Sequence, residues 1–153
     1  MRIDYKRQPS VYGPMRGLSQ AVREGPLERR LIELVEVRAS QLNGCAHCLE
    51  MHTKNARALG ESEDRLHLLA AWRDAPTFSE RERAALSWTE ELTLLPSRDV
   101  PDELYEDVRR VFSEEELCHL TMAIVTINGW NRLAVAFRAP VGNHAAPPER
   151  APA

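Results

Sequence analysis

The apolar residues of this chain recur at steps of three, four and seven along most of its length, and most runs end at proline or glycine. Such spacing lines the apolar side chains along one face of a helix, whereas a half-buried strand needs strict alternation. Between residues 27 and 42 the pattern is regular, and Asn43-Gly44 ends it because either residue tolerates a left-handed C-cap. We see no alternating run and no internal repeat. The pattern predicts an all-α protein.

The same signals predict about six to seven helices in a single domain. Capping boxes at Ser79-x-x-Glu82 and Ser113-x-x-Glu116 mark two helix starts. With 153 residues the chain can bury about two-thirds of its unfolded surface in one core. We expect an N-terminal arm with little structure at residues 1–10, a helical domain at 11–139 and a flexible, proline-rich tail at 140–153. The expected helices span residues 11–25, 27–42, 45–59, 62–74, 79–95, 101–112 and 113–137.

Charge and cysteine content narrow the classes of function. The formal net charge is -3 and the pI about 6.0, so the chain has no basic excess for binding nucleic acid. No run of about 18 apolar residues occurs, which predicts a soluble, cytoplasmic protein with no membrane partner. Two of the three cysteines are only three positions apart, unlike the disulfide framework of a secreted domain. Redox chemistry or metal binding is the expected use of that pair.

The segment from Leu117 to Phe137 is apolar almost all round, which is typical of a core helix or a subunit interface. An apolar segment of this length favours assembly of the chain into a homo-oligomer. Cys118 in this segment is expected to be a core thiol rather than a third redox partner. The three tryptophans stand on apolar helix faces and are expected in the core or in oligomer contacts, not as a platform for substrate. They are Trp72, Trp88 and Trp130.

Cys45 and Cys48 form a C-x-x-C pair with His47 between them and His52 four residues beyond. If a helix starts at Cys45, then Cys45, Cys48 and His52 lie along one face. The helix N-terminus favours thiolate at both sulfurs, and His52 adds a base for Cys48. This asymmetry suggests that Cys48 attacks an oxidant such as a peroxide, and that Cys45 then closes a disulfide onto the sulfenic acid.

A carboxylate is expected to supply the proton that the leaving group needs. If two helices pack antiparallel across Asn43-Gly44, then Glu33 lies level with His52 and approaches Cys48. Glu36 is a competitor on the same geometry, one turn nearer the break, and spacing alone does not choose between them. A buried carboxylate beside an imidazole would form a coupled pair able to shuttle a proton.

The pattern E-x11-C-x-H-C-x3-H, formed by Glu33, Cys45, His47, Cys48 and His52, resembles the signature of AhpD-like alkylhydroperoxidases in the carboxymuconolactone decarboxylase superfamily. The late segment I-N-G-W-N-R-L-A-V, residues 127–135, also resembles family members. The resemblance implies that Cys48 is the peroxidatic cysteine and Cys45 the resolving one. It makes Glu33, rather than Glu36, the relay partner of His52, with His47 in support. It further implies an all-helical fold, assembly as trimers or hexamers, and in some members recharging through lipoyl groups.

The sequence thus predicts a peroxidase that reduces hydroperoxides and needs neither haem nor metal for the chemistry. Its expected partners are a hydroperoxide substrate and an external dithiol reductant, for which the family resemblance implies a lipoyl-bearing protein. One alternative is another activity of the superfamily, such as a lactone decarboxylase. Another is a redox-sensing or zinc-binding module, in which Cys45, Cys48 and His52 supply three ligands and His47 or Glu33 the fourth.

Overall fold

The computed structural model describes residues 1–97 and 99–145, and this part of the chain is all-α, as the sequence predicts. Seven α-helices and three short 3-10 helices form it, and the described residues include no strand. The α-helices are α1 Pro9–Glu24, α2 Arg29–Leu42, α3 Ala46–Ala58, α4 Glu63–Leu68, α5 Glu80–Thr93, α6 Asp102–Val111 and α7 Glu114–Phe137. The 3-10 helices are η1 Tyr5–Arg7, η2 Leu69–Ala71 and η3 Leu95–Ser97.

The helix starts follow the sequence signals closely, and one expected helix is split. Both capping boxes are formed, at Ser79 with Glu82 and at Ser113 with Glu116. The helix expected at residues 62–74 is instead α4 followed by η2. A 3-10 helix has three residues per turn, so side chains three apart lie on the same side. The tighter winding suits the buried residues of this stretch, which recur every third position: Leu66, Leu69, Trp72 and Ala75.

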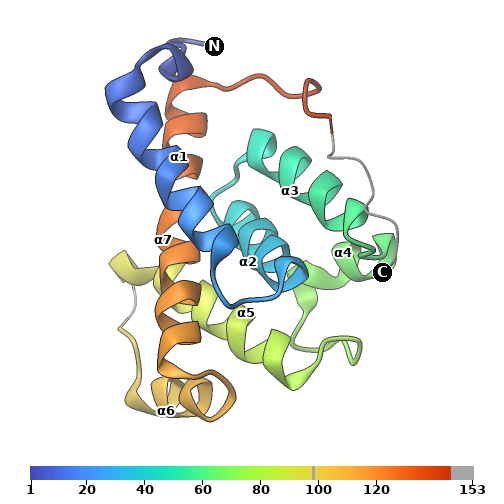
Figure 1. The fold of residues 1–153 in the computed structure, drawn as a ribbon. Coiled ribbons are helices and arrows are strands. Elements are labelled where there is room, and N and C mark those ends of the chain that lie inside the picture. The colour runs from blue at the N-terminus through green and yellow to red at the C-terminus, as the bar shows by residue number, and fades with distance from the viewer. Residues whose placement is uncertain (98, 146–153) are drawn as a thin grey trace.

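Helix α2 lies at the centre of the fold and packs against α3, α5 and α7 (Figure 1). Its residues from Leu31 to Val37 are all buried, and they include the carboxylates of Glu33 and Glu36. Buried carboxylates need charged or hydrogen-bonding partners, because their transfer from water into an apolar interior is unfavourable. The position of α2 therefore implies that something in the interior pairs with both groups.

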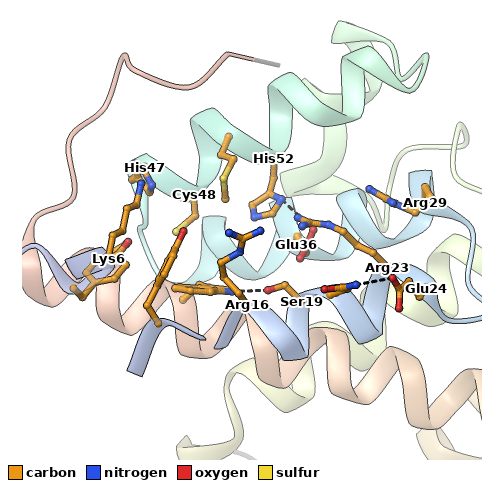
Figure 2. Close-up of a pocket in the computed structure, with 16 residues that line it drawn as sticks. Lys6, Arg16, Ser19, Arg23, Glu24, Arg29, Glu36, His47, Cys48 and His52 are labelled. Atoms are coloured by element: carbon orange, nitrogen blue, oxygen red, sulfur yellow. Dashed lines mark hydrogen bonds and ion pairs between the residues drawn. The ribbon is translucent and has the colours of Figure 1, made fainter. Parts of the chain in front are cut away.

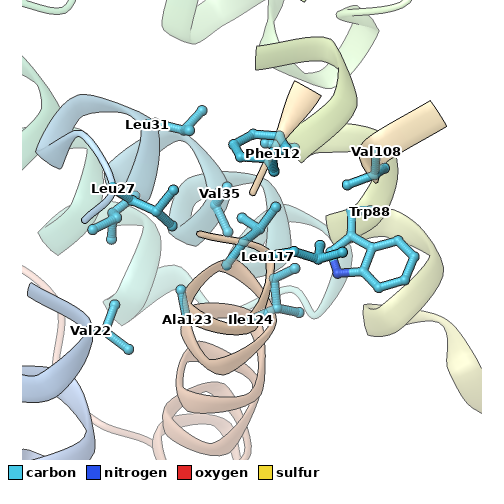
Figure 3. Packing of buried hydrophobic residues seen from close by; sticks show 13 residues of the cluster. Val22, Leu27, Leu31, Val35, Trp88, Val108, Phe112, Leu117, Ala123 and Ile124 are labelled. Atoms are coloured by element: carbon cyan, nitrogen blue, oxygen red, sulfur yellow. The ribbon is translucent and has the colours of Figure 1, made fainter. Parts of the chain in front are cut away.

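The main hydrophobic cluster packs one face of α7 against α2, α5 and α6 (Figure 3). The opposite face of α7 is exposed, with Met122 40% and Val125 54% accessible. Cys118 lies on this exposed side, so the prediction of a core thiol was wrong. The reason is the helical period, since Leu117, Leu120 and Ile124 take the buried stripe and place residue 118 outside it.

The N-terminal residues are held against the end of α7, which the apolar pattern does not predict. The backbone N–H of Arg2 donates to the carbonyl oxygen of Phe137 at 2.7 Å. Tyr5 is buried, and its ring lies 6.2 Å from the rings of both Trp130 and Phe137. Helix α1 then runs beside α7 (Figure 1). This arrangement brings the first turns of α1 close to the late segment of α7.

After α7 the chain crosses to α3 and runs along it (Figure 1). The backbone N–H of Gly142 donates to Glu50 at 2.7 Å, and Lys54 donates to the carbonyl oxygen of His144 at 2.9 Å. Residues 146–153 of the expected tail lie outside the described residues. Among the helices described, none has the length and hydropathy needed to cross a membrane.

Candidate active site

The turn between α2 and α3 places the cysteine pair. Asn43 caps α2, and Gly44 follows with a φ of +64°, a conformation that side chains other than glycine rarely adopt. The backbone N–H of Cys45 then donates to the carbonyl oxygen of Ser40 at 3.0 Å, and Cys45 becomes the N-cap of α3. The predicted break at Asn43-Gly44 is confirmed, with α3 beginning one residue after Cys45.

Asn43 also fixes this turn to α7. Its side-chain amide lies 3.0 Å from Oδ1 of Asn128 and 2.9 Å from Oδ1 of Asn131. Asn131 in turn donates to the hydroxyl of Ser40 at 3.1 Å, and Asn128 donates to Thr93 at 3.0 Å. The asparagines of the segment I-N-G-W-N-R-L-A-V therefore anchor the turn that carries the cysteines. Its tryptophan, Trp130, donates to Ser19 of α1 at 2.8 Å.

Cys45 and Cys48 are joined in a disulfide. The backbone N–H of Cys48 also donates to Sγ of Cys45 at 3.3 Å, so the sulfur of Cys45 takes the role of an N-cap acceptor. Both cysteines are only 1% exposed, yet Cys48 forms part of a pocket wall and Cys45 does not. The two sulfurs thus differ: that of Cys48 faces the pocket, while that of Cys45 lies behind it at the helix N-terminus.

His52 meets two carboxylates through one ring nitrogen. Nδ1 lies 2.8 Å from Oε2 of Glu33 and 3.0 Å from Oε2 of Glu36. Only the contact with Glu33 has hydrogen-bond geometry, so Glu36 acts on the imidazole mainly by its charge. All three residues are at most 5% exposed. The other ring nitrogen, Nε2, is buried and has no hydrogen-bond partner among the described residues.

The two carboxylates keep His52 charged despite its burial. Burial by itself lowers the pKa of His52, but the charge of Glu36 and the hydrogen bond with Glu33 raise it to about 10. Burial raises the pKa of Glu33 and outweighs the lowering effect of its bond with His52. For Glu36 the effect of burial is outweighed by the charge of His52, and the pKa is lowered. Because the three groups are coupled, they titrate as one unit.

A pocket of about 450 Å³ lies between α3 and α1, with Cys48 and His52 of α3 in its wall (Figure 2). This volume lies in the usual range for sites that bind small molecules. The pocket is bounded by polar and cationic side chains of α1 and by aromatic rings from η1, α1 and α7. Its lining includes Tyr5, Lys6, Tyr12, Arg16, Ser19, Arg23, Arg29, Glu36, His47, Met51 and Trp130.

The structure brings the predicted site residues close together where α2 packs against α3. Glu33 and His52 are brought together as expected, and Cys48 and His52 line the same pocket one turn apart on α3. His47 also lines the pocket, where its Nδ1 lies 2.6 Å from the carbonyl oxygen of Pro140. Glu36, which spacing left open and the resemblance set aside, contacts His52 as well. His52 therefore lies in a cluster of three groups rather than in a pair with one carboxylate.

Sequence reasoning missed the contribution of α1 and Trp130. Tyr12, Arg16, Ser19 and Arg23 occur at steps of four, three and four, a polar stripe that by itself reads as a solvated helix face. The structure turns this stripe towards the pocket. Trp130, expected in the core or an oligomer contact, is half-buried and forms part of the pocket wall.

Two sets of residues bear on metal binding. The set expected for zinc is not assembled in this disulfide form, because the sulfurs of Cys45 and Cys48 are bonded to each other and His47 faces Pro140. Glu33, Glu36 and His52 offer ligand atoms that lie within 4.8 Å of one another, close enough to hold a metal ion. With Nδ1 of His52 already between the two carboxylates, the protonated imidazole supplies the positive charge in that cluster.

Comparison with known proteins places the chain in a family. The carboxymuconolactone decarboxylase family matches residues 9–91. The chain is 41% identical over 142 residues to the uncharacterized protein YdfG of Bacillus subtilis (strain 168), covering 93% of this chain and 94% of that one. It is 30% identical over 102 residues to the uncharacterized protein YnjA of Escherichia coli (strain K12), covering 67% and 56%.

Solved structures agree with this assignment. A protein of unknown function from Agrobacterium tumefaciens, described as a candidate AhpD antioxidant defence protein, is 41% identical, with a TM-score of 0.88 over 92% of this chain and 99% of that one. A peroxidase-related protein from Ralstonia eutropha with an AhpD core is 18% identical, with a TM-score of 0.80 over 91% and 74%, and shares the fold. The chain belongs to the carboxymuconolactone decarboxylase family and is an AhpD-like member of it.

Proposed function

We propose that the chain is a thiol-dependent peroxidase that reduces organic hydroperoxides through a Cys45/Cys48 dithiol–disulfide cycle. One observation carries the proposal. Cys48 lies at the pocket and is bonded to Cys45 behind it, and a buried, charged imidazole follows one turn later on the same helix. A peroxidatic thiolate needs access to substrate, a resolving thiol within bonding distance and a proton for the leaving group. The residues present meet all three needs.

The cycle begins from the reduced pair. The Cys48 thiolate attacks one peroxide oxygen, the O–O bond breaks, and the alcohol leaves after it takes a proton. Nε2 of His52 is the atom best placed to hold that proton, because Nδ1 is engaged by Glu33 and Glu36. Cys48 is left as a sulfenic acid. The Cys45 thiol then attacks the Cys48 sulfur, the S–S bond forms, and the oxygen leaves as water.

An external dithiol completes the cycle by giving two electrons to the disulfide and becoming oxidised itself. Attack at the Cys48 sulfur would expel the Cys45 thiolate. The backbone N–H of Cys48, which already donates to Sγ of Cys45, would stabilise that anion. A lipoyl-bearing protein is one candidate donor, and the cytoplasm is a compartment with the required reductants.

Replacement of single cysteines tests the roles. Cys48→Ser should abolish peroxide-dependent turnover, and retained turnover would refute the proposal. The Cys45→Ser variant should react once with peroxide and go no further, because no Cys45 thiol is left to form the disulfide. Mass spectrometry after one equivalent of peroxide should then find one oxygen added at Cys48. Cys118→Ser is the matched control, because its thiol is exposed on α7 and lies outside the pocket lining.

Metal analysis of the same preparations tests the zinc-binding alternative, which stoichiometric zinc held by the cysteines would favour.

Self-association, as a trimer or hexamer, is part of the proposal. Apolar side chains on α1 and α7 remain accessible in the single chain, including Val11, Leu18, Met122 and Val125. Exposed apolar side chains that gather in one patch mark protein–protein contacts, and α1 and α7 pack side by side. Sedimentation equilibrium would decide, and a monomer at micromolar concentration would contradict the expectation.

A further inference from the structure

The pocket at Cys48 is markedly cationic, although the chain as a whole has a formal net charge of -3. Lys6, Arg16, Arg23 and Arg29 line it. Most other arginines of the described chain pair with a carboxylate, as Arg38 does with Glu90 at 2.8 Å. None of the four side chains in the pocket makes an ion pair or hydrogen bond with another described residue. Their positive charge is therefore not neutralised by direct contacts.

The carboxylates of the pocket wall are already engaged. Glu36 lies beside Nδ1 of His52, and Glu24 accepts a hydrogen bond from Gln20 at 2.8 Å. Among the described residues, these two groups are the only acidic ones in the lining, against four lysine and arginine side chains. The pocket thus keeps an excess of positive charge. Anions are attracted into a cleft of this kind because its low-dielectric walls focus the field.

One side of the same cavity is aromatic. Tyr5, Tyr12 and Trp130 line it, with the ring centroids of Tyr12 and Trp130 5.7 Å apart and those of Tyr5 and Trp130 6.2 Å apart. The hydrogen bond from Trp130 to Ser19 fixes the indole ring. A wall of this kind binds an apolar or aromatic body by area and by ring contacts.

Helix α1 places the two kinds of group together. Its polar stripe carries Tyr12, Arg16 and Arg23 along the pocket, opposite Cys48 and His52 on α3. Figure 2 shows the Arg16 side chain rising from α1 towards Cys48 and His52. A guanidinium matches a carboxylate with two parallel hydrogen bonds, so an arginine near the sulfur can orient an anionic substrate as well as attract it.

We propose that this pocket selects hydroperoxides that carry a carboxylate on an apolar or aromatic body. The inference rests on the proposed peroxidase function and names its substrate class. The carboxylate would be held by Arg16 and Arg23, and the apolar body would lie against Tyr12 and Trp130. The peroxide oxygen would then reach the Cys48 sulfur, where the O–O bond breaks and the organic product leaves as an alcohol with its carboxylate unchanged.

The first experiment compares cumene hydroperoxide with its para-carboxylate derivative under an excess of one dithiol donor. The carboxylated substrate should have the higher kcat/KM, by about tenfold or more, with most of the gain in KM. Arg16→Gln and Arg23→Gln should each reduce that ratio severalfold. Arg110→Gln is the matched control, because Arg110 is exposed on α6, pairs with Asp107 and lies outside the pocket lining. An equal kcat/KM for the two substrates would overturn the inference.

A second experiment does not depend on turnover. The Cys48→Ser protein is titrated calorimetrically with 4-isopropylbenzoate and with 4-isopropylbenzamide, which has nearly the same shape and no charge. The benzoate should bind at least about tenfold more tightly, and Arg16→Gln should remove most of the difference. Equal affinities would sink the carboxylate preference even if the protein reduces peroxides. A preference for benzoate without any peroxide turnover would instead refute the proposed reaction and leave the anion site standing.

Discussion

Glu36 and His52 form an ion pair at the centre of the site, with Oε2 of Glu36 3.0 Å from Nδ1 of His52. Glu33 takes the hydrogen bond from the same nitrogen at 2.8 Å. The imidazole of His52 thus contacts two carboxylates in different ways. Glu33 accepts a hydrogen bond from Nδ1, whereas Glu36 interacts with the ring mainly through its negative charge. The arrangement fixes which ring nitrogen is left without a carboxylate among the described residues, and that nitrogen is Nε2.

Replacing the two glutamates one at a time should separate these roles. Glu36→Gln removes the charge that contributes most to the raised pKa of His52, and should lower that pKa by about 1–3 pH units. Glu33→Gln keeps a carbonyl oxygen able to accept the hydrogen bond and should lower the pKa less. NMR titration of the His52 ring in each variant measures both effects. An unchanged pKa in Glu36→Gln would contradict the role given to Glu36.

The charged imidazole also predicts how stability depends on pH. The pKa of His52 is about 10 in the folded protein against 6.5 for a free histidine, so folding favours the protonated form. That contribution is fully present below about pH 6.5 and is lost as the pH rises through 10. The free energy of unfolding of the wild type, relative to His52→Gln, should therefore fall by up to a few kcal/mol across this range.

Denaturant titrations at several pH values would measure that difference. His67→Gln replaces an exposed histidine on α4 and provides the matched control. A wild-type advantage that stays constant or grows between pH 7 and 10 would show that His52 does not gain its proton on folding.

The sequence could predict the relation between α2 and α3 because it depends on local rules. Asn43-Gly44 marks the turn, the helical rise sets the depth, and together they place Glu33 beside His52. The same rules could not choose between Glu33 and Glu36, because both lie at a depth that reaches the imidazole. In the structure both carboxylates contact the imidazole, because a buried cation can pair with two carboxylates at once.

The pocket could not be predicted in the same way, because its walls come from segments far apart in the chain. The polar stripe of α1 resembles any solvated helix face until α1 is packed against α7. That packing depends on close contacts such as Gly129 against Met15, where an added Cβ would lie 2.9 Å from the Met15 Cε. The exposure of Cys118 is likewise set by how α7 is rotated about its axis. Neither the packing nor the rotation is encoded in a local pattern.

Asn43 is expected to be the most sensitive polar residue outside the cluster formed by Glu33, Glu36 and His52. Its amide joins the cysteine-bearing turn to Asn128 and Asn131, and Asn43→Ala would leave these buried groups short of a partner. We expect a loss of about 1–3 kcal/mol in the free energy of unfolding, measured by urea titration. Gln41→Ala is the control, because the Gln41 side chain accepts one hydrogen bond from Arg38, which keeps its ion pair with Glu90, and the loss should stay below about 1 kcal/mol. Equal effects of the two variants would show that the asparagine contacts contribute little.

The thiols should differ sharply in reactivity in the oxidised protein. Cys118 is free and exposed, while Cys45 and Cys48 are bonded to each other, so iodoacetamide should label one cysteine per chain before reduction and three after it. Peptide mapping should place the first label at Cys118, because alkylation requires a free, accessible thiol. The second and third labels should appear only after treatment with a dithiol.

If Cys118 resists labelling in the native protein but reacts after unfolding, its side of α7 must be covered by another copy of the chain. Labelling of Cys48 before reduction would mean that the disulfide is not the resting state, and the cycle would then have to start from the free thiol.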